Sequence, residues 1–291
     1  MLKETIKSLD IKSNGIYVDL TFGGGGHSNE ILKCLGKNGK LIAFDQDTDS
    51  MRNEIKDDRF ILINQNFKFL TQNLIFYGHK YVDGILADLG VSSFQIDQIE
   101  RGFSLRSDAK LDMRMNKKQE ITAADILNNY TEEELSSIFY EHSDIKNSRS
   151  IAKLIINNRI KSKINSSQKL NEILSPLVSG RYQNKILAKI YQAIRIEVND
   201  EIGVLKELLV QIPGVLKKNG KVTIITYHSV EDRLVKRYFQ NGCFDTEPFK
   251  DKFGNIETPL KKCFKFKKPS KKEIKKNSRS RSAKLRCAIK L

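Results

Sequence analysis

The stretch that decides the fold is residues 15–47, GIYVDLTFGGGGHSNEILKCLGKNGKLIAFDQD. The apolar run Ile16–Leu20 predicts a strand, and the glycines Gly23–Gly26 predict a turn whose backbone can approach a ligand without a Cβ in the way. The next residues have the apolar spacing of a helix, and Leu41–Phe44 predicts a second strand. Asp45 closes this strand–helix–strand unit about 20 residues after the glycines, where a carboxylate can bind the hydroxyls of a cofactor ribose. The stretch therefore indicates a site for a nucleotide-type cofactor.

The pattern of alternating strands and helices continues on both sides of a helical interruption. Phe60–Ile63 and Val82–Leu89 predict two further strands, and Val222–Tyr227 predicts another, after a long helix from Ile194 to Leu216 and a turn at 218–220. A helix around Val230–Phe239 follows. Near-continuous apolar strands that alternate with helices predict an α/β fold with a doubly wound, parallel, Rossmann-like sheet.

Residues 105–190 contain no convincing strand but several helix signals. Thr122 precedes one apolar-periodic stretch, Thr131 with Glu134 forms a capping box ahead of a second, and Ser148 precedes a third. The sequence thus predicts a discontinuous domain, 1–104 and 191–291, interrupted by a small all-helical insertion at 105–190.

Composition limits the class of protein. The chain has 291 residues, of which 39% are hydrophobic, with no apolar run long enough to span a membrane and no signal peptide at the start, so we expect it in the cytoplasm. The four cysteines are far apart in the sequence and lack metal-ligand spacing, so neither a metal site nor a disulfide framework is expected.

Positive charge is concentrated at the C-terminus. The chain has 51 Lys and Arg against 35 Asp and Glu, and residues 261–291 alone hold 14 basic residues and one Glu. A disordered solubilising tail is one interpretation, but the interleaved apolar residues favour strand-like pieces with basic side chains facing outward. Such a surface suits the phosphates of a nucleic acid.

Five separated motifs resemble the bacterial ribosomal RNA small subunit methyltransferase H family. They are FGGGGHS (22–28), ADLGVSSFQIDQIERGFS (87–104), LDMRMN (111–116), TYHSVEDRLVKRYF (226–239) and NSRSRSAKLR (277–286). The resemblance implies a class I methyltransferase sheet and transfer of a methyl group from S-adenosyl-L-methionine. The implied acceptor is the exocyclic N4 amine of a cytidine in the decoding region of 16S ribosomal RNA, so the implied partner is this RNA in an assembled or assembling 30S subunit.

The resemblance also implies a set of cofactor-binding residues: Gly25, Gly26, His27, Asp45, Phe67, Asp88 and Gln95. In this reading His27 lies near the methionine moiety, Asp45 binds the ribose and Phe67 forms an apolar wall near the adenine. Each has a structural alternative: His27 as a helix cap or structural histidine, the two aspartates as helix caps, and Phe67 as core.

Asp88 and His228 are the candidate catalytic residues. Methyl transfer needs close placement of the acceptor more than it needs a strong base, and an oxygen that accepts the N–H of the cytosine amine would assist it. Asp88 or a backbone carbonyl in residues 89–92 could supply that oxygen. His228, after the strand at 222–227, is the second candidate for a contact to the base or for a proton acceptor. Phe94 is a candidate stacking surface.

Two departures from the family pattern are present. A glycine stands in the glycine turn where the family usually has arginine, and residues 185–189 read KILAK where it has a His-Pro-Ala-Thr-Arg run. The first departure should leave cofactor binding intact, whereas the second could alter substrate contacts. Two other classes stay open: a nicotinamide-dependent oxidoreductase, which uses the same βαβ unit, and a non-catalytic RNA-binding protein.

Overall fold

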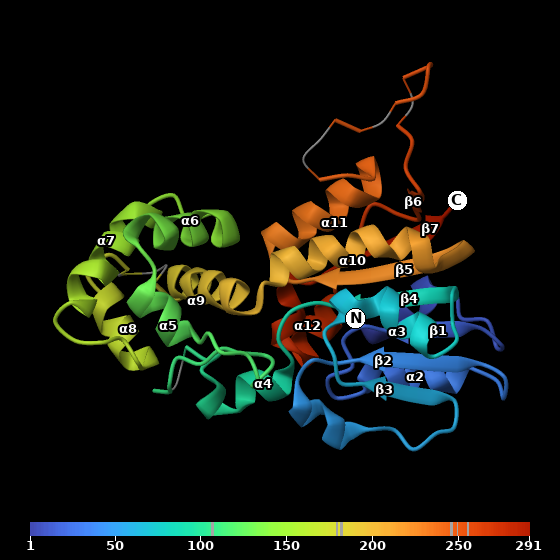
Figure 1. The fold of residues 1–291 in the computed structure, drawn as a ribbon, viewed down its shortest axis with the longest axis horizontal. Coiled ribbons are helices and arrows are strands. Elements are labelled where there is room, and N and C mark those ends of the chain that lie inside the picture. The colour runs from blue at the N-terminus through green and yellow to red at the C-terminus, as the bar shows by residue number, and fades with distance from the viewer. Residues whose placement is uncertain (106–107, 179, 181–182, 245–246, 249, 255) are drawn as a thin grey trace. The chain divides into compact units, whose positions relative to one another are not determined.

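The computed structural model describes residues 1–291 apart from 106–107, 179, 181–182, 245–246, 249 and 255. The chain forms two compact units (Figure 1). The first unit consists of Met1–Gly90 and Gly203–Leu291, and the second of Val91–Ile202. Within the described ranges, no helix has the length and apolar character that crossing a membrane requires.

The first unit is built on a seven-stranded sheet with the order β3-β2-β1-β4-β5-β7-β6. Its strands are β1 (Ile16–Asp19), β2 (Lys40–Phe44), β3 (Phe60–Ile63), β4 (Val82–Asp88), β5 (Leu216–Thr226), β6 (Leu260–Lys262) and β7 (Lys284–Lys290). The first five strands run parallel, and β7 lies antiparallel to both β5 and β6. The predicted α/β class with a Rossmann-like sheet is confirmed.

Helices cover both faces of this sheet because alternate strand residues point to opposite sides. On one face Val18 and Ile85 belong to a core that includes residues of α3 (Leu70–Phe76), α10 (Glu201–Val215) and α11 (Ser229–Asn241). On the other face Tyr17 and Leu86 pack with residues of α1 (Leu2–Leu9) and α2 (Gly26–Cys34). Both faces of the central strands are therefore buried, which accounts for their nearly continuous apolar sequence.

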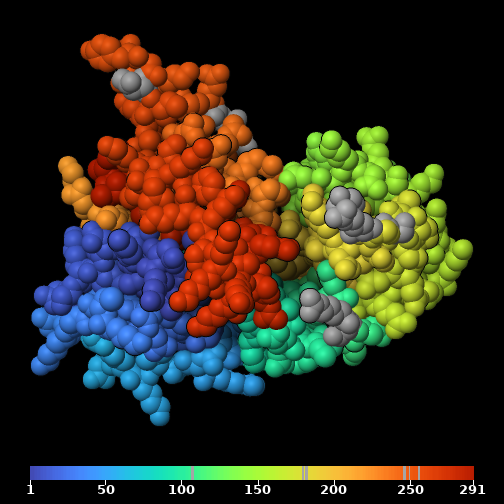
Figure 2. All heavy atoms as spheres, turned by 180° about the vertical axis from the view of Figure 1, so that it is seen from behind, coloured from blue at the N-terminus to red at the C-terminus, as the bar shows by residue number. Residues whose placement is uncertain are grey.

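The basic C-terminal segment is partly built into the sheet. β7 is buried between β5 and β6, and Arg286, expected to face outward, is 5% exposed and donates from Nε to Asp232 Oδ1 at 2.7 Å. That part of the prediction was wrong because α11 covers this face of β7 and supplies Asp232 as the partner of the buried guanidinium. The other basic residues lie on β6, at the two ends of β7, on α12 (Lys271–Lys276), on the 3₁₀ helix η5 (Ser278–Ser282) and in the chain between these elements. Figure 2 shows red C-terminal residues gathered beside the blue N-terminal ones of the same unit.

The second unit is helical. Its elements are α4 (Ser93–Asp97), η3 (Ile99–Arg101), α5 (Ala123–Asn129), α6 (Glu132–Ser143), α7 (Ser148–Arg159), α8 (Ser167–Leu174) and α9 (Gln183–Asn199). The predicted capping box is confirmed, since Thr131 accepts from the backbone of Glu134 while the Glu134 side chain accepts from the backbone of Thr131. The apolar stripes of α5 to α9 meet in one buried core.

The second unit extends further in both directions than the predicted insertion 105–190. The long helix expected from Ile194 to Leu216 is instead two helices, because the chain turns at Asp200, whose φ is 47°. The end of α9 therefore packs into the helical core through Val198. On the other side, the LDMRMN loop belongs to the same core through Leu111 and Met113.

Two buried polar side chains hold this loop. Asn199 accepts from the backbone N–H of Met115 at 2.7 Å and donates to the carbonyl of Met113 at 2.8 Å. Arg101 donates to the carbonyls of Arg114 and Met115 at 2.9 and 3.0 Å. The motif at 111–116 and the part of the motif 87–104 that follows residue 90 thus have a structural role, because they help to build the second unit.

Candidate functional site

Three carboxylates lie at the carboxyl ends of neighbouring parallel strands. Asp19 ends β1, Asp88 ends β4, and Asp45 directly follows β2. Because β1 pairs in parallel with both β2 and β4, all three lie at the same edge of the sheet. This edge is where ligands bind in doubly wound sheets.

The glycine turn between β1 and α2 is open on one side. Gly25 has a φ of +72°, and a Cβ at this position would lie 3.1 Å from the Phe22 ring, so both conformation and space require glycine. A Cβ on Gly24 or Gly26 would meet no other heavy atom within 4 Å. The turn is therefore tight against the protein at Gly25 and free toward a ligand at the two flanking glycines.

Asp45 is held by the glycine turn. Its Oδ2 accepts from the backbone N–H of Gly23 at 2.8 Å, and its Oδ1 accepts from the N–H of Asp47 at 2.9 Å. Asp45 is not a helix cap, because Asp47 caps the 3₁₀ helix η1 (Thr48–Asn53). A carboxylate has about four acceptor sites, so acceptor capacity remains for a ribose hydroxyl. Burial raises the pKa of Asp45 to about 6, so the carboxylate is mostly ionised at pH 7.

His27, Asp88 and Tyr227 form a connected polar group. His27 Nδ1 lies 3.6 Å from Asp88 Oδ2, and the Tyr227 hydroxyl donates to Asp88 Oδ1 at 2.9 Å. Burial raises the pKa of Asp88, and the neighbouring His27 opposes this shift. The backbone N–H of Asp88 donates to Thr21 Oγ1 at 2.7 Å, which ties the end of β4 to the glycine turn.

The other nitrogen of His27 is available for a ligand. His27 Nε2 is buried, and no hydrogen-bond partner for it exists in the part of the chain that the structure describes. His27 does not cap α2, since the N-cap is Gly25. A buried nitrogen without a partner costs free energy, so the site fits a ligand that brings a polar group to this position.

Asp19 is a site residue that the sequence analysis did not identify. It is fully buried, its Oδ2 accepts from Ser28 Oγ at 2.7 Å, and its Oδ1 accepts from the backbone of Thr21 at 3.1 Å. Burial raises the pKa of Asp19. The side chain joins the end of β1 to the turn and to the first turn of α2, so it positions the glycines. An acid ending a buried strand just before four glycines was the available signal.

The loop after β3 borders Asp45. Asn64 Nδ2 donates to the Asp45 carbonyl at 2.9 Å, and Asn66 Nδ2 donates to Gln46 Oε1 at 2.8 Å. Phe67 begins the 3₁₀ helix η2 (Phe67–Phe69) and packs, partly buried, against the sheet core. The fold thus brings Phe67 to the loop beside Asp45, and its contact with adenine stays a prediction.

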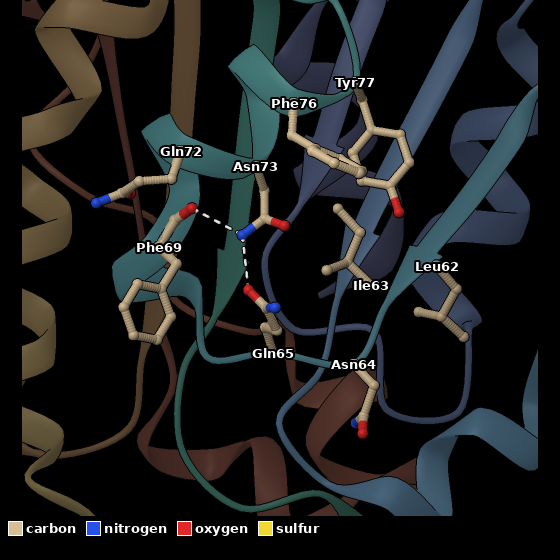
Figure 3. Close-up of a pocket in the computed structure, with 9 residues that line it drawn as sticks. All are labelled: Leu62, Ile63, Asn64, Gln65, Phe69, Gln72, Asn73, Phe76 and Tyr77. Atoms are coloured by element: carbon tan, nitrogen blue, oxygen red, sulfur yellow. Dashed lines mark hydrogen bonds between the residues drawn. The ribbon is translucent and has the colours of Figure 1, made fainter.

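A pocket of about 500 Å³ lies between β3 and α3 (Figure 3). Its lining consists of Leu62, Ile63, Asn64, Gln65, Phe69, Gln72, Asn73, Phe76 and Tyr77. In Figure 3 Asn73 crosses it to bond with Gln65 Oε1 and with the Phe69 carbonyl. None of these nine residues is a predicted cofactor residue, and Asn64 connects the pocket to Asp45.

Two of the predicted site residues, Gln95 and His228, take part in helix capping in the structure. Gln95 lies in the second unit, where its Oε1 accepts from the Ser92 backbone at 3.0 Å in the capping box of α4. His228 is the N-cap of α11: its Nδ1 accepts from the backbone of Glu231 at 3.4 Å, and its Nε2 lies 3.1 Å from Glu231 Oε1. A ligand contact by either residue stays a prediction.

Comparison with known proteins agrees with this geometry. The model of the MraW methylase family matches residues 1–291. The chain is 55% identical over 291 residues to a protein of Christiangramia forsetii named Ribosomal RNA small subunit methyltransferase H, which covers 100% of this chain and 96% of the relative. A protein of the same name from Flavobacterium psychrophilum is 54% identical over 290 residues, with 100% of both chains covered.

The matching family is a family of methylases, so the comparison does not support the alternative of a nicotinamide-dependent oxidoreductase. S-adenosyl-L-methionine, the cofactor that the resemblance implies, fits the site on two grounds: the lone pairs of Asp45 suit a ribose, and the partnerless His27 Nε2 suits a polar group of the methionine moiety. Both the match over the whole chain and the relatives' identity lead to one conclusion: the chain belongs to the MraW methylase family.

Proposed function

We propose that this protein methylates the exocyclic N4 amine of a specific cytidine in the decoding region of 16S ribosomal RNA. The observation that carries the proposal is the identity of 55% over the whole chain to a relative named as a small subunit ribosomal RNA methyltransferase. Support for the acceptor comes from the motifs at 22–28, 87–104 and 226–239, which resemble that family.

The residues at the sheet edge would bind the cofactor in three parts. Asp45 would accept hydrogen bonds from the ribose hydroxyls, and the backbone at Gly25 and Gly26, which is open at Gly26, would bind the methionine moiety together with His27. Phe67 would lie against the adenine, and Gln95 is proposed as a further contact. A carboxylate at the ribose also disfavours a 2′-phosphate, because like charges repel.

S-adenosyl-L-methionine supplies an electrophilic methyl group on a sulfonium. We propose that Asp88 acts on the acceptor amine; its Oδ1 accepts from the Tyr227 hydroxyl at 2.9 Å, and its Oδ2 lies 3.6 Å from His27 Nδ1. An amine N–H donated to this carboxylate would orient the nitrogen lone pair, and Asp88 would hold the proton that leaves as the N–C bond forms. Burial raises the pKa of Asp88 and so makes it a better proton acceptor than an exposed carboxylate.

His228 is the second candidate for this role. Its Nδ1 accepts from the Glu231 backbone as the cap of α11, and its buried Nε2 lies 3.1 Å from Glu231 Oε1, so a role for His228 would have to be reconciled with this cap. The proposal therefore assigns proton acceptance to Asp88, and His228 remains the alternative contact to the base.

The target base must leave its stack to reach the site, which is easiest in single-stranded or loop RNA. We propose that α12 and η5 bind phosphates of the surrounding RNA in an assembled or assembling 30S subunit, and that residues 91–202 recognise the substrate. The N-terminal ammonium of Met1 pairs with Glu273, the only acidic side chain in residues 261–291, so the charge of this carboxylate is compensated within the basic segment. Such a substrate would place the reaction in the cytoplasm.

The test is transfer of labelled methyl groups from S-adenosyl-L-methionine to small subunits that lack the modification, followed by nucleoside analysis. We expect N4-methylcytidine at one position, formed at least about 100-fold more slowly with Asp88→Asn. Label in another nucleoside would contradict the proposed acceptor. No label, despite calorimetric binding of the cofactor, would contradict the proposed RNA substrate but leave the family assignment intact.

A further inference from the structure

Two cysteines that are distant in the sequence meet in the sheet of the first unit. β6 pairs antiparallel with β7, and the register Lys262↔Ala288 places Cys263 opposite Cys287. The Cys263 backbone N–H donates to the Cys287 carbonyl at 2.9 Å, and the two Sγ atoms lie 3.3 Å apart. The sequence analysis expected no disulfide framework because it could not see this pairing.

The backbone already has the spacing that a disulfide needs. Residues directly opposite each other in an antiparallel pair have Cα atoms about 4.5–5.5 Å apart and side chains on the same face. A disulfide takes Cα separations of about 4.4–6.8 Å and an S–S bond of about 2.05 Å. Only a small rotation of the two side chains is therefore needed to close the gap between the sulfurs.

The two thiols have complementary environments. Cys263 is exposed, and Cys287 is 1% exposed. The thiol hydrogen bond from Cys287, with the nearby Lys221, lowers the pKa of Cys263 to about 7. The same contact and burial raise the pKa of Cys287. At neutral pH Cys263 is thus the accessible nucleophile, and Cys287 is the adjacent thiol that can resolve an oxidised sulfur.

We propose that Cys263 and Cys287 are a redox modification site, which a peroxide converts to an intramolecular disulfide. The Cys263 thiolate attacks one peroxide oxygen, the O–O bond breaks, and sulfenic acid and hydroxide form. Cys287 sulfur then attacks the Cys263 sulfur, the S–O bond breaks, and water leaves with the Cys287 proton. Two sulfurs are oxidised by two electrons in total, and one hydrogen peroxide is reduced to water and hydroxide.

The disulfide would link the two ends of the basic segment. Residues 264–286, which include α12 and η5, lie between the two cysteines. A disulfide across this segment restricts the unfolded chain, so the oxidised protein should unfold several degrees higher than the reduced protein. The modification therefore acts on the part of the first unit that carries most of the positive charge.

The test uses the full-length Cys34→Ser/Cys243→Ser variant, so that only the two proposed thiols remain. After treatment with hydrogen peroxide at pH 7 and digestion with trypsin without reductant, we expect peptide 263–265 (CFK) joined to peptide 287–290 (CAIK), with two hydrogens lost. Dithiothreitol should separate them. With a pKa of about 7 at Cys263, the oxidation rate should rise about tenfold from pH 6 to pH 8.

The matched control adds Cys263→Ser to this variant. Cys263 is exposed, so the substitution should not disturb folding. Peroxide should then no longer oxidise the remaining thiol, Cys287. Adding Cys287→Ala instead should leave Cys263 to stop at sulfenic acid, detectable with dimedone. Three outcomes would overturn the proposal: both thiols unchanged, sulfinic acid at Cys263 without the cross-link, or a disulfide between Cys263 residues of two chains. Circular dichroism of each variant confirms that the fold is retained.

Discussion

The carboxyl edge of the sheet and the C-terminal basic segment both carry charge, but they use it differently. At the edge, Asp45 and Asp88 are partly buried, and their oxygens are held by Gly23 and Tyr227. In the basic segment, Lys271, Lys272 and their neighbours on α12 are exposed. Charges at the edge should therefore act through geometry, one atom at a time, whereas charges on α12 should act through their number and be screened by salt.

The largest effect is expected at Asp88. Asp88→Asn keeps the shape of the side chain but cannot accept a proton, so turnover should fall by roughly 10²–10⁴-fold. Methyl transfer under single-turnover conditions measures this, with calorimetric cofactor affinity measured on the same variant. If the entire loss is found in cofactor affinity, Asp88 only binds. His228→Ala, tested alongside, should lose far less.

Asp45→Ala should weaken cofactor binding by roughly 10–100-fold, because charge-assisted hydrogen bonds to the ribose are lost. Asp57→Ala is the matched control: it removes the same charge from the same β2–β3 connection, but Asp57 pairs with Arg59 at the surface. Calorimetry on both variants separates a contact from a general loss of negative charge. Equal affinities would remove Asp45 from the site.

On α12, the expected loss of RNA binding depends on how many positive charges are removed. Replacing Lys271, Lys272, Lys275 and Lys276 by alanine should weaken RNA binding roughly tenfold at physiological salt and make the dependence of log K on log salt shallower. Cofactor affinity should not change. Truncation after Pro259 cannot serve here, since it would remove β7 from the sheet. An unchanged salt slope would show that the RNA lies elsewhere.

Cofactor affinity should depend on pH through Asp45. Its pKa of about 6 means that the carboxylate is mostly protonated at pH 5, so affinity should fall several-fold to tenfold between pH 7 and pH 5. The sign for stability is opposite: a raised pKa in the folded state favours the protonated form, so this group's contribution decreases as pH rises from about 4 to 6. Calorimetry measures the pH dependence of cofactor affinity by comparing the wild type with Asp45→Asn, whose cofactor affinity should not change between pH 5 and pH 7.

The strands could be predicted because burial on both faces gives them a nearly continuous apolar sequence. The glycine turn could be predicted because a φ of +72° at Gly25 favours glycine. The predicted β3, Phe60–Ile63, agrees residue for residue with the structure. Asp19 had a local signal, whereas the roles of Tyr227 and of the inward-facing Arg286 could not be predicted, because each depends on which elements become neighbours. The pairing of Cys263 with Cys287 has the same cause. Local sequence thus indicated the elements, and the sheet order determined the contacts.

The smallest effects are expected from substitutions at two adjacent glycines, Gly24 and Gly25, which should differ in cost. Gly24→Arg restores the residue that the family usually has, and its Cβ would meet no atom within 4 Å, so stability and cofactor affinity should stay within about 0.5 kcal/mol of the wild type. Gly25→Ala forces a Cβ to 3.1 Å from the Phe22 ring at a φ of +72°, so the free energy of unfolding should fall by about 1–2 kcal/mol. Denaturant unfolding of both variants measures the difference. If the two substitutions cost the same, the turn does not have the backbone conformation on which the cofactor site depends.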